Sequence, residues 1–240
     1  MRLDLFLYHN GFARSRTHAS NLVKLRKVKL NGVVVSKVSV EVLPETKIEV
    51  SQTDNFVSLG GIKLQKAFDA FGIDIHGKEA IDIGASNGGF TDVLLKNHAK
   101  KVYAVDVGDC ALPAEFISDS RVVVKDRLNA RYITFEDIGV TVDLIVVDVS
   151  FISLKLMIPP LLQFMKPNTE LVALIKPQFE AGKKALTKSG ILTSKKTALK
   201  VIEELSNFII ALGLCVIGVT EAPRPFPDKN QEYLIYCRKL

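Results

Sequence analysis

The stretch Asp82-Ile83-Gly84-Ala85-Ser86-Asn87-Gly88-Gly89-Phe90 follows an apolar run, and a second apolar run ends at Asp106, 24 residues after Asp82. A strand that ends in a glycine-rich turn lets the backbone approach a ligand closely. An acid at the tip of the next strand can accept hydrogen bonds from both ribose hydroxyls of an adenosine. The pair of motifs therefore predicts a nucleotide-cofactor pocket. In a competing interpretation, Gly88 and Gly89 only relieve a tight turn between strand and helix.

The spacing within this turn favours one cofactor over another. A dinucleotide fingerprint has the pattern G-x-G-x-x-G, whereas this turn has an acid before its first glycine and the pattern D-x-G-x-x-x-G-G. S-adenosylmethionine has no pyrophosphate to cradle, and an acid suits its cationic amino group. We therefore expect S-adenosylmethionine. The expected cofactor contacts are Asp82, Gly84, Ala85, Ser86, Asn87, Gly88, Gly89, Phe90, Asp106, Val107 and Asp126.

Two members of this set have strong alternatives. Asp126 ends the third expected strand, where it would face the adenine amino group, but an ordinary strand-end acid explains it nearly as well. Phe90 either packs under the cofactor loop or belongs only to the core.

Length and composition allow one full α/β domain and a smaller unit. The chain has 240 residues, of which 48% are hydrophobic and 24% are charged. Its longest apolar stretch, 208–219, is shorter than the roughly 20 residues that span a bilayer. The amino terminus does not resemble a signal peptide, so we expect a cytoplasmic protein. The three cysteines lack C-x-x-C spacing and the four histidines lack ligand spacing, so no metal is expected.

Positive charge is concentrated near the amino terminus. The net charge is +6, and residues 1–54 contain nine Lys or Arg against five Asp or Glu, which is +4. Solvated surface charges explain the count alone, but their arrangement favours an anionic partner such as RNA. The expected RNA contacts are Arg2, Arg14, Arg16, Lys24, Arg26 and Lys27.

The local pattern of this segment predicts a compact α+β unit. Residues 3–9 form a helical pattern, and Ser15 is a typical N-cap for a second helix with basic residues at both ends. Asn31-Gly32 is a strong hairpin signal, and 47–50 is expected to be a last strand. We place this unit at 1–54, a linker at 55–60 and a second domain at 61–240.

The second domain alternates helices and strands. Such alternation predicts βαβ units and a largely parallel, Rossmann-like α/β sheet, whose ligands bind beyond the carboxyl ends of the strands. The expected strands are 80–84, 101–106, 121–124, 143–149, 170–175, 214–220 and 233–238.

Four charged residues stand at strand or helix ends where this sheet would bind a ligand. Asp148 and Lys176 follow the fourth and fifth strands, Lys63 begins the helix before the first strand, and Glu232 precedes the last strand. A single lysine at a strand end is usually a surface residue. Beside a methyl-donor loop, the four together suit methylation of a ribose 2′-hydroxyl, a weak acid that benefits from a base.

Each of the four has an expected role. Lys176 is the base, or the cation that stabilises the developing alkoxide, and Asp148 orients its amine. Glu232 fixes the hydroxyl or the lysine pair, and Lys63 holds the ribose or its phosphate. Methylation of a base nitrogen typically uses Asp/Asn-Pro-Pro-aromatic after the fourth strand, whereas this chain has Asp148-Val-Ser-Phe.

The sequence resembles known families along essentially its whole length. Residues Arg2-Leu-Asp, Ala13 to Arg16 and Val28 to Gly32 resemble the alpha-L RNA-binding domain. The four charged residues resemble the Lys-Asp-Lys-Glu tetrad of FtsJ-like ribose 2′-O-methyltransferases. With Ser150-Phe-Ile-Ser-Leu154 and Lys176-Pro-Gln-Phe-Glu180, the likeness is closer still to the TlyA family of haemolysin-like ribosomal RNA methyltransferases.

This resemblance implies S-adenosylmethionine-dependent 2′-O-methylation of cytidine in ribosomal RNA, with an effect on sensitivity to capreomycin-type antibiotics. Because the chain starts directly at the small domain, we expect the large subunit to be the substrate. Two residues depart from the family pattern. Leu59 replaces an arginine near the hinge. Arg26 replaces a glycine, and since a left-handed backbone is costly for arginine, we expect the second helix to end differently.

Other classes of function remain open at this stage. The alternatives are a haemolysin or membrane-active protein, an RNA-binding protein without catalysis, and an NAD-dependent enzyme that lacks its fingerprint. Residues 178–192, rich in Lys, Gly and Ser, are expected to form a lid or an RNA contact, or else a solvated loop.

Overall fold

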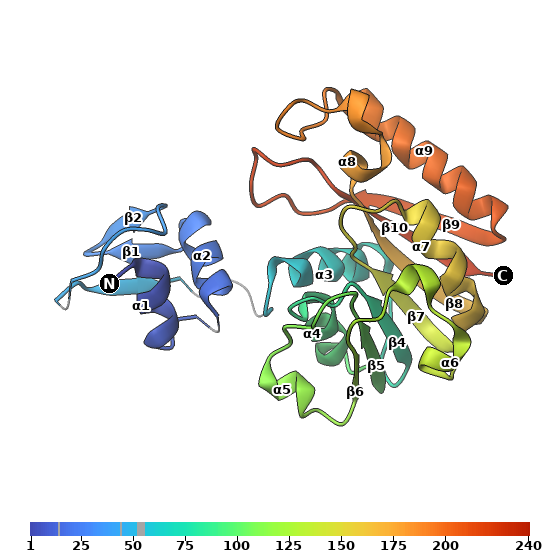
Figure 1. Cartoon of the computed structure of the whole chain (residues 1–240), viewed down its shortest axis with the longest axis horizontal. Coiled ribbons are helices and arrows are strands. Elements are labelled where there is room, and N and C mark those ends of the chain that lie inside the picture. Colours follow the sequence, from blue (N-terminus) through green and yellow to red (C-terminus); the bar gives the residue numbers. More distant parts are fainter. Residues whose placement is uncertain (14, 44, 52–55) are drawn as a thin grey trace. The chain divides into compact units, whose positions relative to one another are not determined.

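The computed structural model describes residues 1–13, 15–43, 45–51 and 56–240. It divides into two compact units, Met1–Ser58 and Leu59–Leu240 (Figure 1). Leu59 and Gly60, which the sequence interpretation gives to the linker, lie in helix α3 (Leu59–Phe71). Asn55, the first residue of the expected linker, lies outside the described residues.

The first unit packs two helices on a small antiparallel sheet. Its elements are α1 (Leu3–His9), α2 (Arg16–Lys24), β1 (Val28–Leu30), β2 (Val33–Val35) and β3 (Ile48–Val50), with sheet order β2-β1-β3. Ser15 caps α2 by accepting a hydrogen bond from the backbone N–H of His18. Leu3, Leu7 and Val23 are fully buried in its core.

Two turns of this unit have left-handed backbones. Asn31 and Gly32, with φ of 48° and 80°, connect β1 to β2 as the hairpin signal predicts. The expectation for Arg26 is wrong, because Arg26 adopts a φ of 59° two residues after α2 ends. The backbone N–H groups of Arg26 and Lys27 bond to carbonyls of Val23 and Leu22, and these bonds offset the cost of that conformation.

The second unit is the Rossmann-like α/β domain that the sequence predicts. Its strands, in chain order, are β4 (Glu79–Ile83), β5 (Lys101–Val105), β6 (Val122–Lys125), β7 (Val142–Val147), β8 (Met165–Ile175), β9 (Leu214–Glu221) and β10 (Tyr233–Lys239). The sheet order is β6-β5-β4-β7-β8-β10-β9. The first five are parallel, and β10 runs antiparallel between β8 and β9.

Helices cover both faces of this sheet (Figure 1). The helices are α3, α4 (Gly89–Lys96), α5 (Ala114–Ile117), α6 (Phe135–Ile138), α7 (Leu154–Leu161), α8 (Pro177–Glu180) and α9 (Lys195–Ala211), with short 3-10 turns at Ala130–Tyr132, Leu162–Phe164 and Lys183–Ala185. No helix in the described part of the chain is long and apolar enough to cross a membrane.

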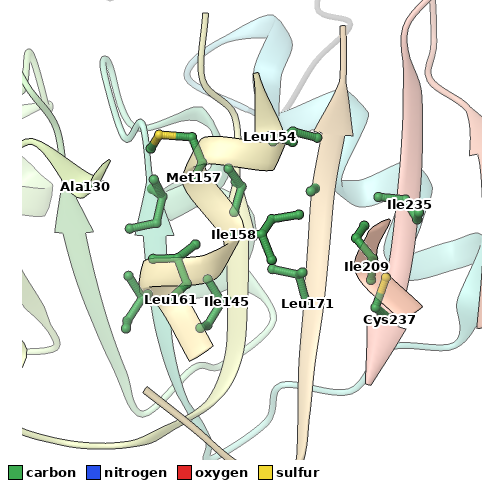
Figure 2. Close-up of a cluster of buried hydrophobic side chains, with 14 of the residues drawn as sticks. Ala130, Ile145, Leu154, Met157, Ile158, Leu161, Leu171, Ile209, Ile235 and Cys237 are labelled. Carbon is green, nitrogen blue, oxygen red and sulfur yellow. The ribbon is translucent and has the colours of Figure 1, made fainter. Parts of the chain in front are cut away.

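One large hydrophobic cluster joins α7 and α9 to the middle of the sheet. Ile158 of α7 and Ile209 of α9 are fully buried there with Ile145, Leu171 and Ile235 from three strands (Figure 2). The central strands are apolar on both faces because helices cover both, whereas β9 alternates as an edge strand does. This packing fixes the strand ends on which the site depends.

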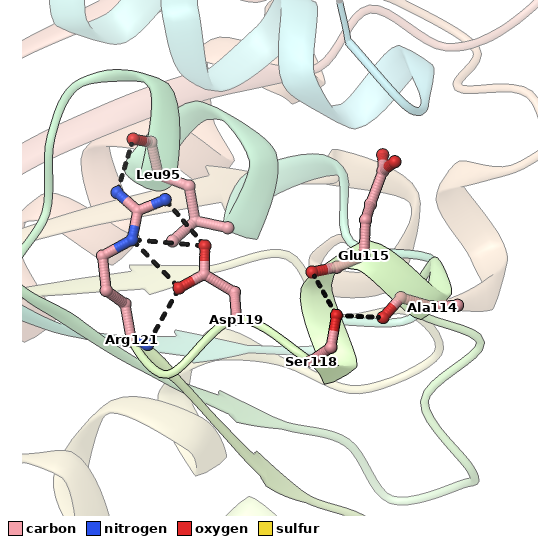
Figure 3. Close-up of polar contacts among 6 residues, drawn as sticks. All are labelled: Leu95, Ala114, Glu115, Ser118, Asp119 and Arg121. Carbon is pink, nitrogen blue, oxygen red and sulfur yellow. Dashed lines mark hydrogen bonds and ion pairs between the residues drawn. The ribbon is translucent and has the colours of Figure 1, made fainter.

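The start of β6 is fixed by a polar network. Arg121 donates hydrogen bonds to both carboxylate oxygens of Asp119 and to the carbonyl of Leu95 at the end of α4 (Figure 3). The Arg121 guanidinium lowers the pKa of Asp119. Ser118 bonds back to the carbonyls of Ala114 and Glu115 and so closes α5.

Candidate active site

Two lysine–carboxylate pairs stand at the carboxyl edge of the sheet. Lys176 Nζ lies 2.7 Å from Asp148 Oδ1, and Lys63 Nζ lies 2.6 Å from Glu232 Oε2. All four side chains are between 11% and 19% exposed. The four residues that the sequence selects therefore meet as two partly buried ion pairs.

Strand register explains this meeting. β7 and β8 are parallel neighbours, so Asp148 and Lys176 leave the sheet at the same edge. Tyr233 pairs with Ile175, which sets the preceding Glu232 beside Lys176 on the adjacent strand. Lys63 comes from α3, which packs against β10.

A hydroxyl completes the surroundings of the Lys176 amine. Nζ donates a hydrogen bond to Ser150 Oγ at 2.8 Å. A lysine ammonium has three donors, and within the described residues Asp148 and Ser150 are its hydrogen-bond and ion-pair partners. One direction is therefore left for a bound hydroxyl.

The glycine-rich turn is built around Gly84 and Gly88. A Cβ on Gly84 would lie 2.3 Å from the carbonyl oxygen of Asp148, and φ there is +85°. Gly88, with φ of +83°, is the N-cap of α4, and a Cβ there would lie 2.9 Å from Leu112. Gly88 therefore allows the tight turn before α4 that the competing interpretation describes. Gly84 allows the backbones that follow β4 and β7 to approach each other closely.

Asp106 organises the mouth of this turn. Its Oδ2 accepts from the backbone N–H of Ser86 and its Oδ1 from that of Gly108, both at 2.9 Å. Each carboxylate oxygen has two acceptor sites, so both keep capacity for ribose hydroxyls. Beside it, Val107 is 67% exposed.

Asp82 lies deeper than the cofactor interpretation requires. It is fully buried, and its Oδ2 accepts a 2.6 Å hydrogen bond from Thr91 of α4. Burial raises the pKa of Asp82 to about 7, despite the opposing hydrogen bond from Thr91. Its Oδ1 has no hydrogen-bond partner in the described part of the chain. The observed bond is structural, between strand and helix.

A cavity of about 430 Å³ opens beside these groups. Of the expected residues, Gly84, Ser86, Asp106, Val107 and Asp148 line it. The sequence interpretation missed a further set of lining residues: Leu128, Asn129, Ala130, Phe151, Ile152 and Met157. Ala85 and Phe90 are buried, and neither they nor Asn87, Gly89 and Asp126 are among the described lining residues.

One of the missed residues carries a signal in the sequence, and another is recognised only in the structure. Asn129 directly follows the loop after β6, where a strand-end polar residue is expected to meet a ligand. Phe151 is 90% exposed with a φ of 65°, and its ring lies 4.9 Å from that of Phe179, centroid to centroid. An exposed aromatic in a strained conformation at a site mouth points to a functional contact.

The structure gives Asp126 a different contact. Its Oδ1 accepts a hydrogen bond from the backbone N–H of Cys110 at 2.6 Å, and hydrogen bonding from Cys110 lowers the pKa of Asp126. This bond ties the loop after β5 to the end of β6. Such a contact is what the alternative interpretation, in which Asp126 is an ordinary acid at the end of a strand, describes.

The donor set fits S-adenosylmethionine. Asp106 offers acceptors for ribose, Asn129 offers a donor and an acceptor, and Leu128 and Met157 offer apolar walls for a purine.

In the first unit, the expected RNA contacts divide into two groups. Arg2 and Arg16 both bond to Asp4, which is 4% exposed, at 3.0 and 3.1 Å. Burial alone would raise the pKa of Asp4, but the two guanidinium groups outweigh it and lower that pKa. Lys24 and Arg26 are exposed and Lys27 is half-buried, whereas Arg14 falls outside the described residues.

The segment 178–192 is more ordered than a solvated loop. It contains α8, the turn Lys183–Ala185 and a β-bridge between Leu186 and Leu192. Glu180 accepts hydrogen bonds from Ser153 Oγ and the Leu154 N–H, which join the segment to the start of α7.

Similarity to known proteins agrees with this geometry. The FtsJ-like methyltransferase family model matches residues 56–239, and the S4 domain model matches 1–48. The 16S/23S rRNA (cytidine-2′-O)-methyltransferase TlyA of Mycobacterium tuberculosis is 39% identical over 99% of this chain and 89% of its own length.

Two further similarities extend over the whole chain. The 23S rRNA (cytidine-2′-O)-methyltransferase TlyA of Campylobacter jejuni is 30% identical over all of both proteins. A solved structure of a putative hemolysin from Streptococcus thermophilus superposes with a TM-score of 0.80 at 35% identity, covering 100% of this chain and 88% of that one. The chain therefore belongs to the TlyA family, in which an S4 domain is joined to an FtsJ-like methyltransferase domain.

Proposed function

We propose that this methyltransferase moves a methyl group from S-adenosylmethionine to the 2′-oxygen of a cytidine in ribosomal RNA, with the large-subunit RNA as its main substrate. One observation carries the proposal: the Lys176–Asp148 pair lies beside a cavity that fits the cofactor. Both TlyA relatives are named for methylation of cytidine, and 23S RNA is the substrate that the two names share.

The cofactor's contribution is an electrophilic methyl group on a sulfonium. Asp106 would accept hydrogen bonds from the ribose of the cofactor, and Gly84 and Ser86 would form part of the wall beside it. Asp148 lines the same cavity and also contacts Lys176. It therefore links the binding of the methyl donor to the amine that acts on the acceptor.

Lys176 acts on the attacking oxygen. Acting as a neutral amine, Lys176 donates its N–H groups to Asp148 and Ser150, and its lone pair takes the proton of the 2′-hydroxyl. At the same time the oxygen bonds to the methyl carbon and the carbon–sulfur bond breaks, which releases S-adenosylhomocysteine. Asp148 orients the amine and balances the positive charge that results, and Ser150 fixes a second direction of Nζ. In-line attack needs the reacting atoms about 3 to 3.5 Å apart, so this orientation controls the rate.

The second pair holds the substrate. Lys63 and Glu232 neutralise one another while keeping donors and an acceptor for the ribose and its phosphate. The exposed ring of Phe151 offers a surface on which the target base can stack once it leaves its helix. The S4 domain supplies exposed cations, among them Lys24 and Arg26, for backbone phosphates.

The test is transfer of labelled methyl to large and small subunits from a strain that lacks the modification. We expect 2′-O-methylcytidine in large-subunit RNA, and none with Lys176→Ala. Label on a base, or on no ribosomal particle despite measured cofactor binding, contradicts the proposal. Growth with and without the active chain on capreomycin measures the expected change in antibiotic sensitivity.

The alternative is a membrane-active protein, and liposome leakage by the same purified protein tests it directly. Leakage of liposomes that persists in Lys176→Ala, together with no RNA methylation, favours a membrane-active protein over the enzyme.

A further inference from the structure

A second cavity, of about 440 Å³, is lined by residues from the start of α9 and from the segment that leads into β10. We name it the α9 cavity. Its lining contains three cations, Lys195, Arg224 and Lys229, and one acid, Glu221, for a formal charge of +2. Ser194, the N-cap of the 17-residue helix α9, also lines this cavity. The α9 cavity is therefore suited to an anion.

The loops that form the α9 cavity are held together by hydrogen bonds of Asn230 and Gln231, and the three cations take no part in these bonds. Asn230 Oδ1 accepts from the Leu192 N–H, and Asn230 Nδ2 donates to the Gly190 carbonyl, both at 2.9 Å. Gln231 Nε2 donates to the Ala222 carbonyl at 2.7 Å. These side chains tie the two loops together and set the width of the opening.

The three cations of the α9 cavity remain available to bind an anion. Lys195 lies 3.5 Å from Glu221 and Lys229 lies 3.8 Å from Asp228, and every side chain in these two pairs is at least 56% exposed. Long, exposed pairs hold their partners weakly. Arg224 is exposed and has no ion pair within 4 Å in the part of the chain that the structure describes.

The α9 cavity lies next to the reacting edge of the sheet. Tyr233 lines it, and the preceding Glu232 points to the other face, where it bonds Lys63. β10 is two strands from β7, which Asp148 directly follows, so these two strands are about 10 Å apart at ordinary strand spacing. A nucleotide adjoining the target ribose spans such a distance.

We propose that the α9 cavity binds a backbone phosphate of the substrate RNA beside the target nucleotide, with Arg224, Lys195 and Lys229 as its ligands. The inference rests on the proposed function and names the substrate contact of the same site. Arg224 supplies a planar fork that matches two phosphate oxygens, and the two lysines supply point charges. The contact positions the RNA and carries no base information.

The test compares the triple variant Lys195→Gln, Arg224→Gln and Lys229→Gln with wild type in methyl transfer to unmodified ribosomal RNA over a range of salt. We expect KM for RNA to rise at least about tenfold near physiological salt, with kcat and cofactor affinity unchanged. The slope of log KM against log salt should decrease by about two to three, one per lost contact. Arg224→Lys should keep most of the slope.

The matched control is the triple variant Lys78→Gln, Lys100→Gln and Lys166→Gln, which removes the same three positive charges at the opposite edge of the sheet, where Lys100 pairs with Glu79 and Lys166 with Asp143. An unchanged KM and slope in the triple variant overturn the inference, as does an equal loss in the control or a fall in kcat alone. If wild type methylates no RNA, the proposed function fails. Binding of ribosomal RNA with S-adenosylhomocysteine then tests the α9 cavity alone, by the same slopes.

Discussion

The two ends of β7 and β8 carry almost the same pair of residues with different consequences. At the carboxyl end, Lys176 lies 2.7 Å from Asp148, and at the opposite end Lys166 lies 2.7 Å from Asp143. The Lys176 side chain is 11% exposed and pairs with Asp148, which lines the 430 Å³ cavity, whereas the side chain of Lys166 is 46% exposed. An ion pair thus occurs at both ends of these strands, and we propose a chemical role only for the pair beside the cavity.

The largest expected effect separates these two lysines. Lys176→Ala removes the group that takes the hydroxyl proton, so we expect kcat for RNA methylation to fall by roughly 10² to 10⁴. Lys166→Ala should leave kcat within twofold and lower the unfolding free energy by at most about 1 kcal/mol, because exposed pairs contribute little. Single-turnover methyl transfer with both variants measures this, and equal losses would erase the proposed distinction between the ends.

The glycines on either side of β4 sharpen the comparison. Gly77 precedes the strand with φ of +70° and nothing within 4 Å of an added Cβ, whereas Gly84 follows it and faces the Asp148 carbonyl at 2.3 Å. Gly77→Ala should cost only about 1 kcal/mol of backbone strain. Gly84→Ala must also displace Asp148, and we expect a loss of roughly 3 kcal/mol or more together with cofactor binding. Denaturant unfolding and cofactor titration measure both losses. Similar costs at the two sites would mean that the turn yields easily.

The fully buried Asp82 and the partly buried Asp143, which lie toward opposite ends of their strands, should change the unfolding free energy in opposite directions as pH changes. Burial raises the pKa of Asp82 to about 7, from an unfolded value near 3.8. Between these values the native state holds a proton that the unfolded chain has lost, so this residue lowers stability as pH rises, by at most about 1.4 kcal/mol per pH unit. Asp82→Asn should therefore flatten the stability curve between about pH 4 and 7, since Asn still accepts from Thr91.

Asp143 is the reference for that measurement. Burial would raise its pKa, but the Lys166 ammonium and the Glu79 N–H outweigh burial and lower it. Its contribution is present above the unfolded pKa and is lost as pH falls through the lower folded value. Asp143→Asn should thus change stability above about pH 4 by a constant amount and remove part of the acid-induced loss below it. Unfolding free energies from pH 3 to 8 follow both variants. An Asp82→Asn curve parallel to wild type would contradict the raised pKa.

Sequence reasoning predicted which side chains of the candidate site would meet where those side chains stand at strand ends. Lys176 and Asp148 follow apolar runs whose length and order predict the sheet, and a parallel sheet gathers its carboxyl ends at one edge. Phe151 and Met157 reach the cavity only through the packing of the loop after β7 and of α7, which no local pattern encodes. For Asp82 the motif indicated a ligand contact, whereas the structure shows full burial against Thr91.

The smallest expected effect concerns one hydroxyl at each end. Ser150 accepts a hydrogen bond from Lys176 Nζ at 2.8 Å and is exposed, whereas Thr169 is fully buried. Thr169 Oγ1 donates to the Val142 carbonyl at 2.6 Å and accepts from the Lys166 N–H at 3.0 Å. Ser150→Ala frees one direction of the Lys176 amine, so kcat should fall about fivefold, the equivalent of about 1 kcal/mol, with an unchanged melting temperature.

Thr169→Val should have the opposite pattern, with lower stability and an unchanged kcat. It leaves a buried carbonyl without its donor, so we expect a loss of about 1 to 3 kcal/mol in unfolding free energy and no change in kcat at a temperature where the fold is intact. Measuring kcat and thermal unfolding for both variants gives four values that test the comparison together. If Ser150→Ala lowers stability instead of kcat, its hydroxyl supports the loop after β7 as Thr169 supports the start of β8, and the orientation of the Lys176 amine then depends on Asp148 alone.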